Sequence, residues 1–253
     1  SEVGGDITIT GDLALTTDAV IRTAGGAGDD IAITGLTDTA AAIAEKSLVL
    51  NAGAGSVTLG GDAGGAVGLS SFAATGGTIS TRSVRTPTGG QTFTGPATVT
   101  GSIASGGDVL FSDTSNITGN VNGAALAFTG NSTVGGNVTG TGNVLFSGTS
   151  NITGNVNGAA LTFTGDSTLG GAVNGTGDIL FSALSTIAGN ITGGSALTFG
   201  GGTLLGGNVT STGAQSADAG ATFGTGAGGA VAVNGASIIV AGPVILDRSA
   251  VFT

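Results

Sequence analysis

A phenylalanine recurs every 17 or 18 residues through the middle of this 253-residue chain. The recurring positions are Phe93, Phe111, Phe128, Phe146, Phe163, Phe181 and Phe199. The sixth and tenth residues after each phenylalanine are always aliphatic, and the eighth is always glycine. A fixed period with matching positions indicates stacked coils, in which each repeat buries its apolar face only against its neighbours.

Residues 108–124 illustrate one coil. Val109 and Phe111 lie two residues apart, so they share the inner face of a short strand while Leu110 points outward. Ser115 and Ile117 predict a second short strand, and Val121 begins a third after a corner at Gly119 and Asn120. The pattern predicts an all-β fold, a parallel β-helix or β-solenoid with about three short strands in each 17/18-residue coil.

Like residues then lie on like residues along the stack. The ninth position after the phenylalanines is a column of asparagines, broken by Ser102 and Ala172. Its asparagines are Asn120, Asn137, Asn155, Asn190 and Asn208. We expect them, with the phenylalanines, to form structural ladders in which side-chain amides hydrogen-bond from coil to coil.

Two successive coils also form a 35-residue unit that repeats. The outward residue before each phenylalanine alternates, so Leu110, Leu145 and Leu180 recur in every second coil. Isolated exposed leucines are common in soluble proteins. The alternative is that the aligned row of leucines makes a lateral contact with another molecule.

We interpret residues 1–253 as a single continuous β-solenoid with three stretches. Residues 1–90 predict longer, irregular coils of about 20–25 residues, residues 91–211 the regular coils, and residues 212–253 irregular terminal coils. The helix-favouring stretch 38–47 is too short for a stable isolated helix, so we expect a projecting loop or a single helical turn.

Neither end of the sequence shows an amphipathic cap. Solenoids normally cover their ends, because an open coil exposes unpaired backbone groups and core side chains. We therefore expect either a segment of something longer or head-to-tail self-association through uncapped terminal coils.

The formal charge is −10, from 15 acidic and 5 basic residues, so a phosphate-binding surface for nucleic acid is not expected. No stretch is apolar enough for a membrane helix, and membrane insertion is not expected. The absence of cysteine excludes thiolate metal sites. We expect no cofactor.

One short motif fits a calcium-binding pattern. Residues 25–33, with Asp29 and Asp30 after a glycine turn, match the nonapeptide whose turns bind calcium in tandem β-rolls. Calcium there lies between consecutive turns, and no second copy stands nine or eighteen residues away. An ordinary turn is the favoured interpretation, with a calcium ion the alternative.

Enzymes that cleave polysaccharides also use parallel β-helices, with clustered carboxylates and a basic residue. This chain has neither His nor Tyr, and its dense charges are Asp29 with Asp30 and Arg82 with Arg85, so we do not expect an enzyme. Ice-binding solenoids display regular rows of threonine. Thr92/Thr94 and Thr162/Thr164 qualify, but intervening coils carry leucine and serine, which breaks the array.

Sequons for N-glycosylation begin at Asn116, Asn131, Asn137, Asn151, Asn190 and Asn208. We expect a glycan in the asparagine column to break the stacking. The sequence therefore favours sequons that arise from the repeat rather than from modification.

Residues 47–65 (SLVLNAGAGSVTLGGDAGG) and 5–11 (GDITITG) resemble the repetitive passages of large bacterial exoproteins of the filamentous-haemagglutinin-like and autotransporter-like kind. The resemblance implies a right-handed parallel β-helix exported to the cell surface, in adhesion, biofilm matrix or surface fibres. It brings no catalytic residues. We expect an extracellular structural protein forming a stalk, matrix or self-assembling fibre, or alternatively an adhesin segment that binds glycan or a host surface.

Overall fold

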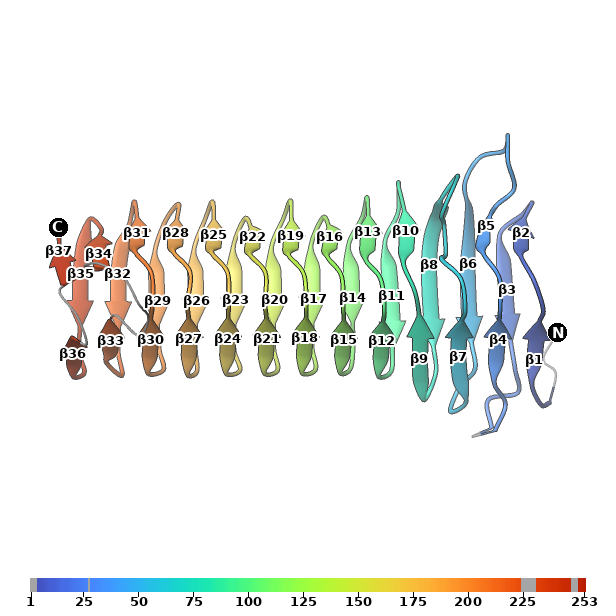
Figure 1. Cartoon of the computed structure of the whole chain (residues 1–253), viewed down its shortest axis with the longest axis horizontal. Coiled ribbons are helices and arrows are strands. Elements are labelled where there is room, and N and C mark those ends of the chain that lie inside the picture. The colour runs from blue at the N-terminus through green and yellow to red at the C-terminus, as the bar shows by residue number, and fades with distance from the viewer. Residues whose placement is uncertain (1–3, 27, 224–230, 247–249) are drawn as a thin grey trace. The chain divides into compact units, whose positions relative to one another are not determined.

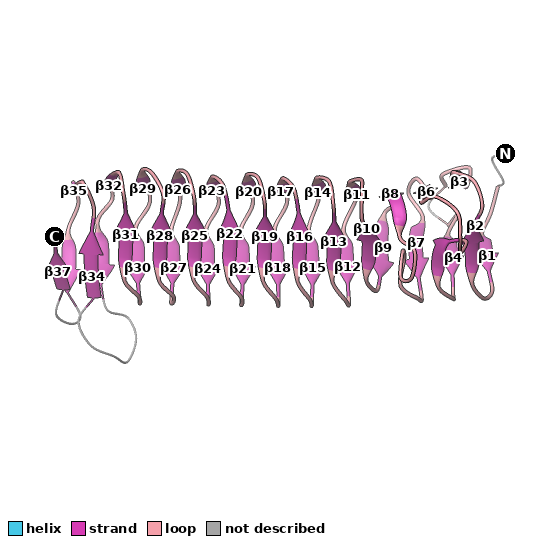
Figure 2. Cartoon of the chain, turned by 90° about the horizontal axis from the view of Figure 1, so that it is seen from above, coloured by secondary structure: helices cyan, strands magenta, loops and turns pink. Residues whose placement is uncertain are grey.

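The computed structural model describes residues 4–26, 28–223, 231–246 and 250–253, and over these residues it contains strands and loops but no helix (Figures 1 and 2). The fold is an all-β parallel β-solenoid of coils of about 18 residues, as the repeat predicts. The chain divides into two compact units, Ser1–Gly130 (unit 1) and Asn131–Thr253 (unit 2), which are described separately. One continuous stack over residues 1–253 stays a prediction.

A regular coil contributes one three-residue strand to each of three parallel sheets. We name the sheets by the residue that typifies their strands in the regular coils: the Phe sheet, the Ser sheet and the Gly sheet. In unit 2, β23 (Leu161–Phe163), β24 (Ser167–Leu169) and β25 (Val173–Gly175) are the three strands of one coil. In each strand the first and third residues point inward and are buried, as the alternation predicts.

In unit 1 the Ser sheet runs in the order β1-β4-β7-β9-β12-β15, the Phe sheet β3-β6-β8-β11-β14-β17 and the Gly sheet β10-β13-β16, with β2 pairing β5. The strands of unit 1 are β1 Ile7–Ile9, β2 Leu13–Leu15, β3 Ala19–Arg22, β4 Ile31–Ile33, β5 Thr37–Thr39, β6 Lys46–Asn51, β7 Ser56–Leu59, β8 Leu69–Thr75, β9 Thr78–Thr81, β10 Val84–Thr86, β11 Gln91–Thr94, β12 Ala97–Val99, β13 Ile103–Ser105, β14 Val109–Phe111, β15 Ser115–Ile117, β16 Val121–Gly123 and β17 Leu126–Phe128.

In unit 2 the Ser sheet runs β18-β21-β24-β27-β30-β33-β36, the Gly sheet β19-β22-β25-β28-β31-β34-β37 and the Phe sheet β20-β23-β26-β29-β32-β35. Its other strands are β18 Ser132–Val134, β19 Val138–Gly140, β20 Val144–Phe146, β21 Ser150–Ile152, β22 Val156–Gly158, β26 Ile179–Phe181, β27 Ser185–Ile187, β28 Ile191–Gly193, β29 Leu197–Phe199, β30 Thr203–Leu205, β31 Val209–Ser211, β32 Ala214–Ala217, β33 Ala221–Phe223, β34 Val231–Asn234, β35 Ser237–Val240, β36 Val244–Leu246 and β37 Ala250–Phe252.

The register gives the coil lengths directly. Ile7 pairs with Ile31, Ile31 with Val57 and Val57 with Ile79, so the first coils of unit 1 are 24, 26 and 22 residues long. In unit 2, Ser150 pairs with Ser167 and Ser167 with Ser185, which gives 17 and 18 residues. Longer coils at the flank and regular coils in the centre are therefore confirmed.

The stretch 38–47 contains no helix. Its residues 40–45 form a loop between β5 and β6 that projects beyond the neighbouring coils (Figure 1). Ala42 in this loop has φ 67°, a left-handed conformation found at no other described non-glycine residue. The expectation of a projecting loop is confirmed.

A column of stacked phenylalanine rings runs through the core of each unit, beside buried aliphatic side chains. In unit 1 the ring centroids of Phe93 and Phe111 are 4.5 Å apart, and those of Phe111 and Phe128 5.2 Å. In unit 2 Phe163 lies 5.1 Å from Phe146 and 4.7 Å from Phe181. These rings are nearly parallel, with interplanar angles of 7–8°, because the in-register ladder gives every ring the same orientation.

The unit 1 column extends by one ring that the 18-residue period does not contain. Phe72 lies 5.5 Å from Phe93 at an interplanar angle of 51°. In the ladder it pairs with Gln91, whereas Ala74 pairs with Phe93. The ring of Phe72 therefore tilts across from the adjacent column and covers the end of the phenylalanine stack.

The corner glycines are required for close approach and not for positive φ. Gly154, Gly171 and Gly207 are absent from the described residues with positive φ. A Cβ on Gly154 would lie 2.5 Å from the carbonyl oxygen of Gly136, and one on Gly207 2.5 Å from that of Gly189. A side chain at this corner therefore collides with the backbone of the preceding coil.

Candidate functional site

The asparagine column lies at the corner between the Ser sheet and the Gly sheet. In unit 2 the backbone N–H of Asn155 donates to Oδ1 of Asn137 (2.8 Å), Ala172 N–H to Oδ1 of Asn155 (2.7 Å), and Asn208 N–H to Oδ1 of Asn190 (2.9 Å). The ladder thus joins the side-chain amide oxygen of one coil to the backbone N–H of the next coil.

The acceptor explains which other residues fit this corner. In unit 1 the hydroxyl of Ser102 accepts the N–H of Asn120 at 3.1 Å, so serine replaces asparagine without losing the bond. Ala172 receives such a bond but has no oxygen to pass it on. The column therefore holds the corner of one coil against the next.

Two further corners use the same bond in alternate coils. In unit 2, Asn143 accepts from Ala160 (3.3 Å) and Asp178 from Ala196 (3.0 Å) at the corner before the Phe sheet. The corner before the Ser sheet has Asn131 accepting from Thr149 (3.0 Å) and Asp166 from Leu184 (3.2 Å). At each of these two corners a side chain that accepts this bond occurs in every second coil. The contacts therefore repeat with the 35-residue unit of two coils.

The carboxylates of the calcium-like motif lie in unit 1 and accept backbone hydrogen bonds. Asp29 accepts the N–H of Gly5 at Oδ1 and that of Gly26 at Oδ2, both at 2.9 Å. Asp30 accepts the N–H of Ser56 at 2.6 Å. Among the described residues no group of three or more His, Cys, Asp or Glu side chains is placed to hold a metal ion. The contacts of Asp29 and Asp30 are those of turn acceptors.

Asp38 anchors the loop before β8. Its carboxylate accepts the N–H groups of Ala66 (2.6 Å), Val67 (3.0 Å) and Gly68 (2.9 Å), together with that of Thr39 (2.8 Å). Burial alone raises the pKa of Asp38, but these hydrogen bonds outweigh it and hold the pKa below 3.8.

Asp18 also has a lowered pKa, because its carboxylate accepts the backbone N–H of Ser47 at 2.9 Å.

The two arginines considered for catalysis also lie in unit 1, with Arg82 exposed after β9 and Arg85 exposed on β10. Arg85 donates from Nη1 to the carbonyl oxygen of Val67 at 3.3 Å. Arg85 thus supports the loop that Asp38 anchors.

The leucines of the proposed lateral row point outward from the Phe sheet and are half-buried. In unit 1 Leu110 lies between Thr92 and Ala127 in the ladder. In unit 2 Thr162 separates Leu145 from Leu180. The row is therefore interrupted by a smaller residue in every second coil.

A more regular polar row lies on the Ser sheet, which the sequence alone did not single out. In unit 2 Thr133, Asn151 and Thr168 pair in register and are all exposed. In unit 1 Ser80, Thr98 and Asn116 do the same. The 18-residue period marks these as outward positions, but only the three-sheet geometry places them on one uncharged face.

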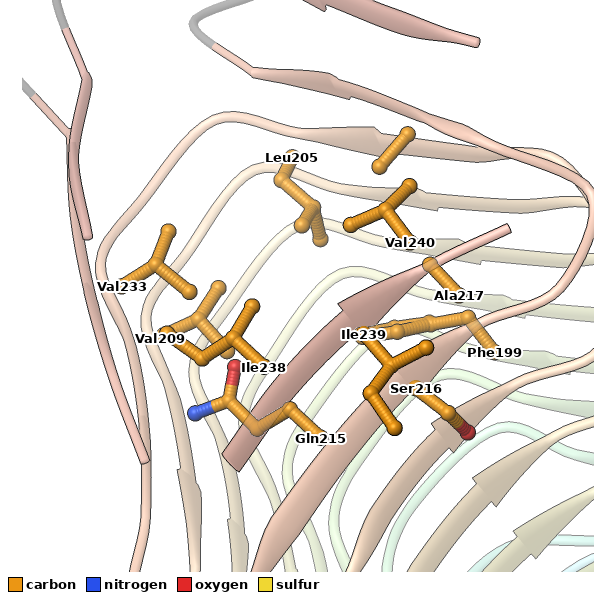
Figure 3. A pocket seen from close by; sticks show the side chains of 11 residues that line it. Phe199, Leu205, Val209, Gln215, Ser216, Ala217, Val233, Ile238, Ile239 and Val240 are labelled. Atoms are coloured by element: carbon orange, nitrogen blue, oxygen red, sulfur yellow. The ribbon is translucent and has the colours of Figure 1, made fainter. Parts of the chain in front are cut away.

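One small apolar pocket lies at the end of the phenylalanine column in unit 2, where Ala217 pairs with Phe199 (Figure 3). Phe199, Leu205, Val209 and Val240 contribute to its lining, and its empty volume is about 290 Å³, part of it open to solvent. The loss of the ring at Ala217 accounts for the space. No cluster of polar groups converges there: Gln215 is the largest polar side chain in the lining.

No family model, curated protein or solved structure matches this chain. None of the described residues forms a helix long and apolar enough to cross a membrane. Any function must therefore be inferred from the fold and its contacts.

Proposed function

We propose that this chain is an extracellular structural protein of the cell surface, a stalk, matrix or fibre element built by stacking β-solenoid coils. The observation that supports this is the pairing of like residues between successive coils, such as Ser150 with Ser167 and Val156 with Val173. Each coil offers the next coil the same backbone hydrogen-bonding groups that the preceding coil offers to it. Adding repeats therefore lengthens the stack. The surface location rests on the sequence resemblance.

We further propose that copies associate head to tail through their terminal coils. In the coil of β35, β36 and β37, the inward-facing Val244 and Phe252 are 45 % and 43 % exposed. Their partners in the preceding coil, Ala221 and Val233, are 4 % and 2 % exposed. Apolar side chains and strand edges at this face suit the docking of a further coil.

Electron microscopy of negatively stained protein at increasing concentration tests this association. We expect unbranched filaments from the unchanged chain and none from Val244→Asp, which places a charge between the coils. Ile245→Asp is the matched control, because Ile245 pairs with Thr222 and points outward from the same strand. Monodisperse monomer at the highest concentration contradicts head-to-tail association, and equal loss with both variants indicates a lateral contact instead.

A second candidate function is an adhesin segment that binds surface glycans. It is favoured by the exposed row of Thr133, Asn151 and Thr168, whose hydroxyl and amide groups match the neutral hydroxyls of carbohydrate. A glycan array probed with the chain and with Asn151→Ala tests it. Binding that weakens in the variant supports this function. If the chain binds no glycan on the array, the adhesin function is rejected and the structural role is the one that remains.

A further inference from the structure

The six sequon asparagines named from the sequence are exposed. Asn116 and Asn151 are the central, outward residues of β15 and β21, and Asn131, Asn190 and Asn208 lie at corners. From the sequence, a glycan at a corner is expected to break the stacking. The corner contacts argue against that expectation.

Of the two polar atoms of each side-chain amide, the oxygen makes the contact between coils at these corners. Oδ1 of Asn131, Asn190 and Asn208 accepts the N–H groups of Thr149, Asn208 and Ala232 at 3.0, 2.9 and 3.0 Å. An N–H can donate only to the oxygen of the amide, so these bonds fix its orientation. Nδ2 then takes no part in the ladder, and an amide substituted at nitrogen keeps its carbonyl acceptor.

The chain contains two internal controls. Asn155 has the same corner geometry, with Oδ1 accepting from Ala172, but its third residue is Asn157 and no sequon results. A seventh sequon, Asn174-Gly175-Thr176, adds to the six named from the sequence. Asn174 is half-buried and its Nδ2 donates to Oδ1 of Asn157 at 2.9 Å, so its nitrogen is engaged.

We propose that Asn116, Asn131, Asn151, Asn190 and Asn208 are acceptor sites for N-linked carbohydrate. In the transfer a bond forms between Nδ2 and C1 of a sugar, and the bond from C1 to a phosphate oxygen of the donor breaks. The donor is a nucleoside-diphosphate sugar or a lipid-linked oligosaccharide, and the Nδ2 proton leaves to a base of the transferring enzyme. Modification of these sites does not depend on whether copies assemble.

The sugars would extend outward from the coils without displacing any core residue. Each of these asparagines is followed two positions later by an exposed threonine, as in Asn190 with Thr192 and Asn208 with Thr210. Carbohydrate at such sites is bulky and solubilising. It would cover a surface that carries little charge of its own.

Peptide mapping by mass spectrometry tests the proposal on the chain isolated from the cells that make it. We expect sugar on peptides containing the five sites, none on Asn155, and less on Asn174 than on any of the five. The proposal is overturned if none of the five sites carries sugar. It is also overturned if Asn155 carries as much sugar as the five sites do. Single sugars indicate a nucleoside-diphosphate donor, and one preassembled oligosaccharide at each site indicates a lipid-linked donor.

The variant Thr192→Val removes the sequon at Asn190 while keeping the β-branched shape and the corner asparagine. We expect loss of sugar from Asn190, unchanged sugar at Asn208, and a melting temperature within error of the parent. Sugar retained at Asn190 contradicts the assignment. Thr210→Val is the reciprocal variant, in which Asn208 loses its sugar and Asn190 retains it.

Discussion

Residues 4–90 of unit 1 and residues 131–217 of unit 2 follow the same three-sheet plan but hold their corners differently. The first region has coils of 22–26 residues, and its corner acceptors include the carboxylates of Asp30 and Asp38. The second has 17/18-residue coils, and its asparagine corner uses neutral amides at every acceptor position. Regular coil length therefore occurs together with a neutral asparagine corner, while the two other corners of these coils include the single carboxylates of Asp166 and Asp178.

Charge follows the same division. Residues 4–90 contain eight acidic and four basic residues, whereas residues 131–217 contain two acidic residues and no basic one. In a regular stack each residue lies over its counterpart at about 4.8 Å, where like charges repel. The two acids of the second region, Asp166 and Asp178, each have uncharged neighbours in their columns. The regular coils thus keep like charges apart, whereas in the longer coils Asp30 lies next to Asp6 and donates its backbone N–H to Oδ1 of Asp6.

The largest expected effect is the loss of a ring from the regular core. Phe163→Ala removes a buried side chain that stacks on Phe146 and Phe181, and should lower the free energy of unfolding by about 3–5 kcal/mol. Denaturant titration measures it. Thr162→Ala, on the outer face of the same strand, is the control and should change stability by less than about 0.5 kcal/mol. Equal effects would show that the inner and outer faces are wrongly assigned.

Glycine substitutions should separate the two regions. Gly154→Val in the regular coils drives a side chain into the backbone carbonyl of Gly136, and should destabilise by about 1–3 kcal/mol or more. Gly65→Val in the irregular region should be tolerated, because a Cβ there meets nothing within 4 Å. An unchanged melting curve for Gly154→Val contradicts the close approach of successive coils.

Asp38 should hold its loop in a pH-dependent way. Because its pKa is lowered in the folded state, its stabilising effect is present above 3.8 and is lost as the pH falls through the lower folded pKa. Asp38→Asn keeps one acceptor oxygen, and should cost about 1–2 kcal/mol after allowing for solvent exposure.

Amide hydrogen exchange at Val67 and Gly68 measures this effect. We expect faster exchange in Asp38→Asn than in the parent chain near neutral pH, with the difference shrinking as the parent carboxylate becomes protonated. Exchange at Asn155, in the regular coils, serves as the reference. Equal protection in both chains near neutral pH would mean that the carboxylate does not hold the loop.

The smallest effect tests the alternation of acceptors. Ala196→Asp places a second carboxylate directly next to Asp178 in its column, and should destabilise by about 0.2–1 kcal/mol at low salt. Ala196→Asn is the neutral control with the same shape. If the two variants are equally stable at low salt, repulsion between stacked charges does not limit the regular coils.

The sequence was sufficient to predict the fold, the inward phenylalanines and the longer coils of residues 1–90. The period did not predict that Phe72 contacts the phenylalanine stack, because Phe72 lies one column away from the other rings in the ladder. It also did not reveal that the asparagines bond through Oδ1, since a period identifies a column but not the atom that bonds. Glycine is required at the corners because each corner lies close to the backbone of the preceding coil. The sequence alone does not show this close approach.

Like residues of successive coils lie over one another in parallel register, as Ser150 with Ser167 and Val156 with Val173. X-ray diffraction from aligned, concentrated protein tests it most directly. We predict a sharp reflection near 4.8 Å together with a circular dichroism spectrum free of helix. Absence of that spacing, or a helical spectrum, would contradict the stacked-coil structure.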